Sequence, residues 1–170
     1  MKTLAAIIIA SAFAGSTALA AMGITPADRH FIRSAMEGGV SEIALAQQVL
    51  RQTSDPTARA FAHRMIRDHS QNDRQLEQVA QSLGMNPPQH PDSDAQQEMQ
   101  QLAGMRPEAA AREYLRYEVS DHHKDIADFT QELSTTSNDQ IRSYVQASLP
   151  VLHAHLRLAE RDASNDSGAR

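Results

Sequence analysis

The sequence predicts an all-α protein, a four-helix bundle with a long crossover between its second and third helices. Apolar residues recur at helical spacing in four segments, each of roughly 25 residues. No segment alternates apolar and polar residues between turn signals, so no strand is expected. Two connections are short, and the long one is rich in proline, as in bundles with one crossover.

The first two helices begin with the same kind of signal. Residues 25–28 (Thr-Pro-Ala-Asp) combine an N-cap threonine, a proline at the first helical position and an acid that completes a capping box. They predict a helix that runs to about Gln52. Asp55-Pro56 repeats the cap and the proline, and Gly84 followed by Pro87-Pro88 ends the second helix.

The crossover holds a short helix, and a third long helix follows it. Ser93 caps the expected short helix Ser93–Ala103, and Gly104 stops it. Pro107 opens the third long helix, which we expect to reach about Leu133.

The fourth helix begins at a second capping box, formed by residues 137–140 (Ser-Asn-Asp-Gln). Pro150 lies inside this helix and is expected to bend it. The small, polar residues 164–170 are expected to form a disordered tail.

A short internal similarity relates the two halves of the chain. Glu-Ile-Ala at residues 42–44 and Asp-Ile-Ala at residues 125–127 stand at equal distances before an aromatic residue. Arg59 and Arg142 each precede that aromatic residue by two positions. The similarity suits a bundle built from two helical hairpins.

The N-terminus has the pattern of a cleaved secretory signal. Lys2 precedes the apolar stretch from Leu4 to Ala14, and small residues at Ala18 and Ala20 give the A-x-A pattern of a cleavage site. The apolar stretch is short for a membrane span, and no later segment approaches one. We therefore expect cleavage near Ala20, one domain over residues 21–163 and a periplasmic location.

The composition excludes several classes of function. The chain has no cysteine, which rules out disulfides and thiolate metal ligands. Acidic residues outnumber basic ones, 21 to 16, so nucleic acid is not an expected partner. Nucleophilic chemistry has no cysteine to use and no turn that would expose a serine, and no glycine-rich loop is present to hold phosphate. The notable residue is histidine, which occurs eight times.

Helical geometry directs several polar residues toward the interior. His122 lies within roughly 10° of the centre of the apolar face of the third helix. Glu118 and Asp125 stack on that face, one turn before it and nearly one turn after. His69 in the second helix and Glu42 in the first also point inward.

In the fourth helix, His153 and His155 flank the apolar stripe on opposite edges, so at most one of them joins a shared site. Buried ionisable groups are costly unless they pair or bind a cation. The candidate metal ligands are Glu42, His69, Glu118, His122, Asp125 and His155.

Four motifs, taken in order, resemble those of the secreted family known as domain of unknown function 4142 (DUF4142). They are Glu42, Met65-x-x-Asp68-His69, Asp121-His122 and Leu149-Pro150-x-Leu152-x-x-His155-Leu156. The resemblance covers nearly the whole chain after the signal. It implies a ferritin-like four-helix fold and an outer-membrane or periplasmic protein without an established activity.

The chain departs from the ferritin-like di-iron pattern, in which two helices each carry Glu-x-x-His. Ile66 stands three residues before His69, and Leu152 stands three before His155. The third helix offers the reversed order, His122-x-x-Asp125. An oxygen-activating di-iron centre is therefore not the expected site.

Two interpretations of the inward residues remain. They form either a structural polar network or a mononuclear site for zinc, iron or manganese built from His122, His69 and one or two carboxylates. Met65 and His69, at i and i+4, offer a less favoured site for copper.

The function expected from the sequence is a non-enzymatic binding or envelope-stress protein. The alternative is a metal-binding or metal-dependent redox protein that uses the inward histidines and carboxylates. A third interpretation is a module whose acidic surface docks another envelope protein. No catalytic residue is predicted, although two carboxylates near a histidine could act as acid and base.

Overall fold

The computed structural model describes residues 23–88 and 90–167. These residues form five α-helices and no strand, so the predicted all-α class is confirmed. The expected signal peptide, the last three residues of the expected tail and Gln89 lie outside the described residues. The helices are α1 (Pro26–Gln52), α2 (Pro56–Ser82), α3 (Ser93–Ala103), α4 (Pro107–Thr135) and α5 (Asp139–Ser167).

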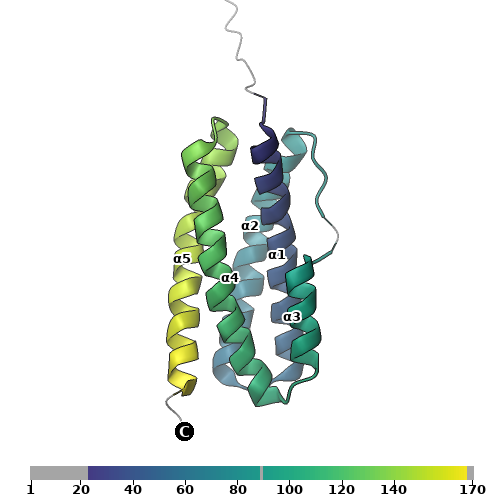
Figure 1. Ribbon diagram of the computed structural model, residues 1–170, viewed down its shortest axis with the longest axis vertical. Helices are drawn as coiled ribbons and strands as arrows, with labels where there is room; N and C mark the ends of the chain where they lie inside the picture. Colours follow the sequence, from purple (N-terminus) through teal and green to yellow (C-terminus); the bar gives the residue numbers. More distant parts are fainter. Residues whose placement is uncertain (1–22, 89, 168–170) are drawn as a thin grey trace, which may run out of the picture.

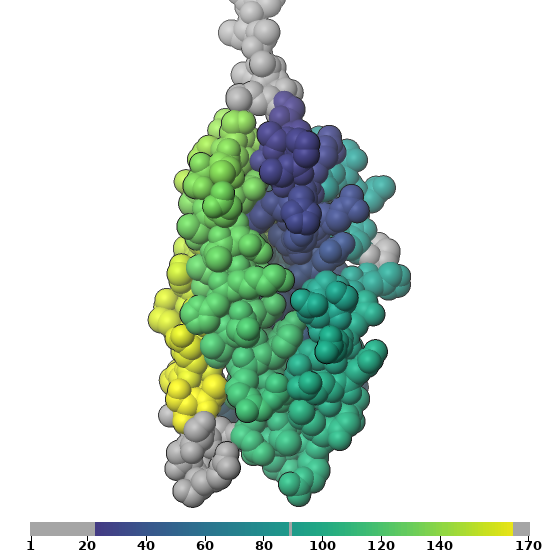
Figure 2. All heavy atoms as spheres, viewed as in Figure 1, coloured from purple at the N-terminus to yellow at the C-terminus, as the bar shows by residue number. Residues whose placement is uncertain are grey.

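The four long helices pack side by side as a helical bundle (Figure 1). Helix α1 packs against α2 and α4, and α5 packs against α4 and α2. After α2 the chain returns along the outside of the bundle, and α3 lies beside the lower half of α1 (Figure 1). Figure 2 shows α1, α3 and α4 meeting on one face of the molecule.

Helix starts follow the sequence signals closely, with two small corrections. Thr25 and Asp28 form the expected capping box, with the Asp28 amide 3.0 Å from Thr25 Oγ1. The cap of α3 is Asp92 rather than Ser93, because the Asp92 carboxylate accepts from the Ala95 amide at 2.9 Å. At α5 the Asn138 side chain, rather than Ser137, accepts from the first-turn amides.

Helix α5 is longer than the sequence suggested. It continues through Ser164 to Ser167, whereas the small, polar residues 164–170 suggest a disordered tail. Pro150 lies within the helix and does not end it.

The crossover begins at Gly84, directly after the last turn of α2. Gly84 has a φ of 70°, a backbone conformation in which glycine is favoured because it has no Cβ.

The two hairpin turns have the same construction, as the internal similarity suggested. Arg59 donates to the carbonyls of Leu50 and Thr53, nine and six residues earlier. Arg142 donates to the carbonyls of Leu133 and Thr136, again nine and six residues earlier. In each turn an arginine therefore satisfies carbonyls at the C-terminus of the preceding helix.

The apolar core is divided into two clusters by a polar layer. One cluster lies around Met65 and Tyr114, and the other lies around Ile32 and Ile141. His69 is the central residue of α2, which places the layer at mid-height in the bundle. Buried charged and polar residues from four helices meet there: Glu42, His69, Glu118, His122 and His155.

Helix α1 buries one face that includes Glu42. Met36, Leu45 and Val49 are buried, whereas Ile43 and Leu50 are only partly buried. Glu42 lies on the buried face and is 1% exposed.

Within residues 23–88 and 90–167, none of the helices combines the length and the hydropathy that a membrane span requires.

Candidate metal centre

Three histidines from three helices converge at the centre of the bundle. The three-histidine cluster consists of His69 from α2, His122 from α4 and His155 from α5. All are buried, with exposures of 5%, 0% and 0%. One ring nitrogen of each lies within 4.8 Å of the others, so the three rings can reach one ion.

Two oxygen partners determine how His122 and His155 are protonated. His122 Nδ1 lies 2.9 Å from the backbone carbonyl of Glu118, which can only accept, so Nδ1 carries the hydrogen. His155 Nε2 lies 3.0 Å from the carboxylate of Asp68. Burial alone would raise the pKa of Asp68. The hydrogen bond from His155 and the charges of His155, Arg67 and Arg64 outweigh burial, so the pKa of Asp68 is lowered. His155 Nε2 therefore donates to an ionised carboxylate.

The remaining nitrogens of these two rings face each other. His122 Nε2 lies 3.3 Å from His155 Nδ1. Burial lowers the pKa of His122 to about 3 and also lowers the pKa of His155, so both rings are neutral at pH 7. The hydrogen of His122 is on Nδ1 and that of His155 is on Nε2. The two nitrogens that face each other therefore both present lone pairs, and no proton lies between them.

The third ring completes the same arrangement. His69 Nε2 is buried and has no hydrogen-bond partner among the described residues. Burial, followed by the nearby His122 and His155, lowers the pKa of His69 well below its usual value. Neutral imidazole is the form of histidine that binds metal ions, and three such rings converge here.

A pair of buried glutamates adjoins the cluster. Glu42 and Glu118 form a second group with His122, whose ligand atoms also lie within 4.8 Å of one another. Glu118 Oε2 lies 3.4 Å from His122 Nδ1. None of the four carboxyl oxygens meets a donor at hydrogen-bond geometry within the described part of the chain, but the two carboxyl groups lie close enough to influence each other's pKa. Burial raises the pKa of both glutamates well above the usual value.

Two aspartates continue this acidic surface of α4. Asp121 and Asp125 are half-buried, and Asp125 belongs to neither group of candidate ligands. Burial, followed by Asp121, raises the pKa of Asp125 to about 8. The acidic row, as we call Glu42, Glu118, Asp121 and Asp125, thus reaches from the protein interior toward the surface.

Of the six candidate ligands named from the sequence, all but Asp125 are buried. His155 is buried and His153 is exposed, which decides between the two edge histidines. Asp68, which precedes His69 in its sequence motif, accepts hydrogen bonds from His155 on α5 and from Arg64. Asp121 was missed, although its i+3 spacing from Glu118 places both on one side of α4.

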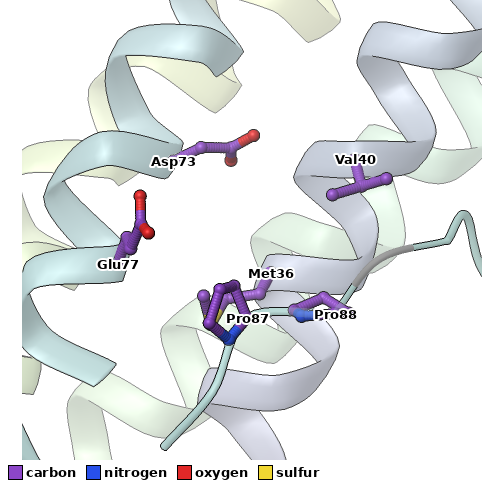
Figure 3. A pocket seen from close by; sticks show the side chains of 6 residues that line it. All are labelled: Met36, Val40, Asp73, Glu77, Pro87 and Pro88. Carbon is purple, nitrogen blue, oxygen red and sulfur yellow. The ribbon is translucent and has the colours of Figure 1, made fainter. Parts of the chain in front are cut away.

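A separate pocket of about 260 Å³ lies between α1, α2 and the loop that follows α2 (Figure 3). Asp73 and Glu77 point into it from α2, and Met36, Val40, Pro87 and Pro88 form its apolar wall. Burial raises the pKa of Asp73 to about 7. None of the three histidines lines this pocket, so it is distinct from the candidate metal centre.

The fold and its buried centre define a class of all-helical bundle proteins with a layer of histidines and carboxylates at mid-height. Within this class, the chain belongs to the family described as Domain of unknown function (DUF4142), which matches residues 14–161. No curated protein matches the chain.

Among solved structures, the chain is similar to the crystal structure of a DUF305 fragment from Deinococcus radiodurans. The TM-score is 0.73 at 17% sequence identity, and the match covers 83% of this chain and 97% of that one. At this identity the similarity is one of fold.

Proposed function

We propose that this protein binds a divalent transition-metal ion, preferentially zinc, through His69, His122 and His155. The observation that carries the proposal is the 3.3 Å separation of His122 Nε2 and His155 Nδ1, two lone pairs that face each other. A cation between them replaces this repulsion with two coordinate bonds.

The separation also supports the choice of ion. Zinc–nitrogen bonds of about 2.0–2.1 Å in a tetrahedron place neighbouring nitrogens roughly 3.3–3.4 Å apart. Imidazole ligands suit zinc, copper, iron and nickel, whereas manganese prefers oxygen. Three nitrogen ligands leave a fourth position for a water molecule or a carboxylate.

The same geometry argues against a purely structural polar network. In such a network each buried polar group pairs with another. Here His69 Nε2 has no partner among the described residues, and no proton lies between the facing nitrogens of His122 and His155. The proposal is therefore the metal-binding alternative, in a protein that holds an ion rather than one that turns over a substrate.

The fold and location complete the proposal. We infer that the bundle belongs to the ferritin-like class, which the antiparallel long helices and the crossover support (Figure 1). The N-terminal pattern of Lys2, an apolar stretch and Ala18-x-Ala20 supports a periplasmic protein. An envelope protein that receives or delivers the metal is the partner that such a location favours.

Equilibrium zinc binding to the metal-free protein tests the three-histidine site. We expect one zinc ion per chain, and cobalt bound in its place should give the visible spectrum of a tetrahedral site. Asp68→Asn should weaken binding by roughly 10–100-fold, because Asp68 orients His155 without being a ligand. His122→Ala and His155→Ala should weaken it further.

His153→Ala is the matched control, since it removes an exposed histidine two residues from His155. It should leave zinc affinity unchanged. If the wild-type protein binds no zinc, or if His153→Ala weakens binding as much as His155→Ala does, the site is not the one proposed.

A further inference from the structure

The three-histidine cluster is buried, so an ion needs a route to it. His122 and His155 are 0% exposed, and His69 is 5% exposed. Polar groups connect the cluster to the surface on two sides. One side is Asp68, and the other is the acidic row.

The Asp68 side is unfavourable for a cation. Arg64 Nε and Arg67 Nε each lie 3.1 Å from an oxygen of Asp68. Two guanidinium groups therefore surround the one carboxylate, and their charge repels an approaching divalent ion.

The acidic row contains only groups that ionise to negative charge, and its exposure is graded. Glu118, Asp121 and Asp125 follow one another at i, i+3 and i+7 on α4, and Glu42 lies across from them on α1. Asp121 is close enough to Glu42 to contribute to its raised pKa. The outer two residues are half-buried, whereas Glu42 and Glu118 are at most 1% exposed.

The outer end of the row lies beside the start of α3. Asp92, the cap of α3, accepts a hydrogen bond of 2.8 Å from Ser41, the neighbour of Glu42 on α1. Asp94 and Asp128 are exposed nearby and add charge around Asp121 and Asp125. Helix α3 begins at about mid-height in the bundle (Figure 1).

The inner end of the acidic row consists of two buried carboxyl groups that lie close to each other. Glu42 and Glu118 are buried, and their oxygens meet no donor at hydrogen-bond geometry in residues 23–88 and 90–167. Carboxylates bind divalent cations through oxygen, but zinc prefers imidazole nitrogen when both are in reach. This preference favours transfer of zinc from these carboxylates to the histidines.

From these observations we infer that the acidic row is the path by which a divalent cation reaches the three-histidine cluster. The ion first meets Asp121 and Asp125, passes between Glu42 and Glu118, and binds beyond His122. This inference rests on the proposed metal-binding function and adds to it the route of loading.

Rapid-mixing measurements of zinc binding to the metal-free, full-length protein test the route. The measurements are made at pH 9, above the pKa of about 8 of Asp125, so that Asp121→Asn and Asp125→Asn remove charge while keeping the side-chain size. Each should slow both association and dissociation by about 10-fold, the lower end of the range for electrostatic focusing. The dissociation constant should remain within a factor of about 2, because a changed path alters both rates alike.

Glu108→Gln is the matched control, an exposed acid on the same helix but in its first turn. It should leave both rates unchanged, and circular dichroism should show the same helical content in all variants. The association rate of wild type should also fall with added salt more steeply than that of Asp121→Asn.

Two results would overturn the route while leaving the metal site in place. One is an association rate unchanged by Asp121→Asn and Asp125→Asn. The other is weaker equilibrium binding at an unchanged association rate, which would make these carboxylates ligands. Absence of zinc binding by the wild type would instead refute the three-histidine site, and the route with it.

Discussion

Gly39 shows how one missing side chain shapes the contact between α1 and α2. A Cβ atom built on Gly39 would overlap the carboxylate of Asp73, whereas one on Gly38 would meet nothing within 4 Å. The absence of a side chain at Gly39 leaves room for the Asp73 carboxylate, whose Oδ1 atom is buried without a partner among the described residues. A side chain at position 39 therefore displaces the Asp73 carboxylate, whereas one at position 38 displaces nothing.

Replacing each glycine with alanine should separate the two roles. Gly38→Ala should stabilise the protein by about 0.5–1 kcal/mol, because alanine favours a helix interior. Gly39→Ala should instead destabilise it by about 1 kcal/mol, since Asp73 must move. Urea unfolding gives both values. Adding Asp73→Ala to Gly39→Ala should restore stability, and failure to do so would show that the carboxylate is not the obstacle.

At the scale of elements, the molecule consists of two hairpins with equivalent turns. Thr53 and Thr136 end α1 and α4, and the hydroxyl of each accepts from the amide two residues later, at 3.1 and 3.2 Å. Arg59 and Arg142 then close the two turns from the following helix. Each hairpin turn is therefore stabilised by its own local contacts.

Substitution of either arginine should weaken its own turn. Arg59→Met and Arg142→Met should each cost about 1–2 kcal/mol, through the loss of charged donors at helix C-termini. Lysine should restore only part, because an ammonium group lacks the planar fork of guanidinium. Thermal unfolding measures the effect, with Arg33→Met on the exposed face of α1 as the control. Equal losses in the control would contradict a role specific to the turns.

At the scale of the whole molecule, the polar layer makes stability depend on pH in two opposing ways. The three histidines have lowered pKa values, so they stabilise the fold above their unfolded pKa and lose that contribution as pH falls. Glu42 and Glu118 have raised pKa values and lose their contribution as pH rises. In the metal-free protein, the change in the free energy of unfolding with pH should therefore be the sum of a histidine contribution and an opposing glutamate contribution.

His122→Gln isolates the histidine part of this balance. The unfolded chain protonates His122 below a pKa of about 6.5, whereas the folded pKa is about 3. The stability advantage of metal-free wild type over His122→Gln should therefore shrink by about 2 kcal/mol from pH 7 to pH 5. Urea unfolding at both pH values measures it, and the shared Glu42 and Glu118 largely cancel. A constant or growing advantage would contradict a buried, neutral His122.

The candidate site was predictable to the extent that it depends on helical phase. His122 and Glu118 lie on the buried side of α4 because residues four apart share a face, and the sequence shows that spacing directly. Asp125 has nearly the same phase but is only half-buried, since burial at a given height depends on the neighbouring helices. The partner of Asp68 was not predictable, because its oxygen meets a ring 87 residues away.

The sequence by itself determined the helices, since caps, prolines and glycines act within a few residues of where they stand. It also determined that ionisable side chains enter the core, because apolar periodicity defines the face that each helix buries. Tertiary structure alone decided which of these groups meet. It chose His155 over His153, placed Glu42 beside Glu118 and set two imidazole nitrogens 3.3 Å apart. Those contacts depend on how the helices rotate and dock, which no single helix contains.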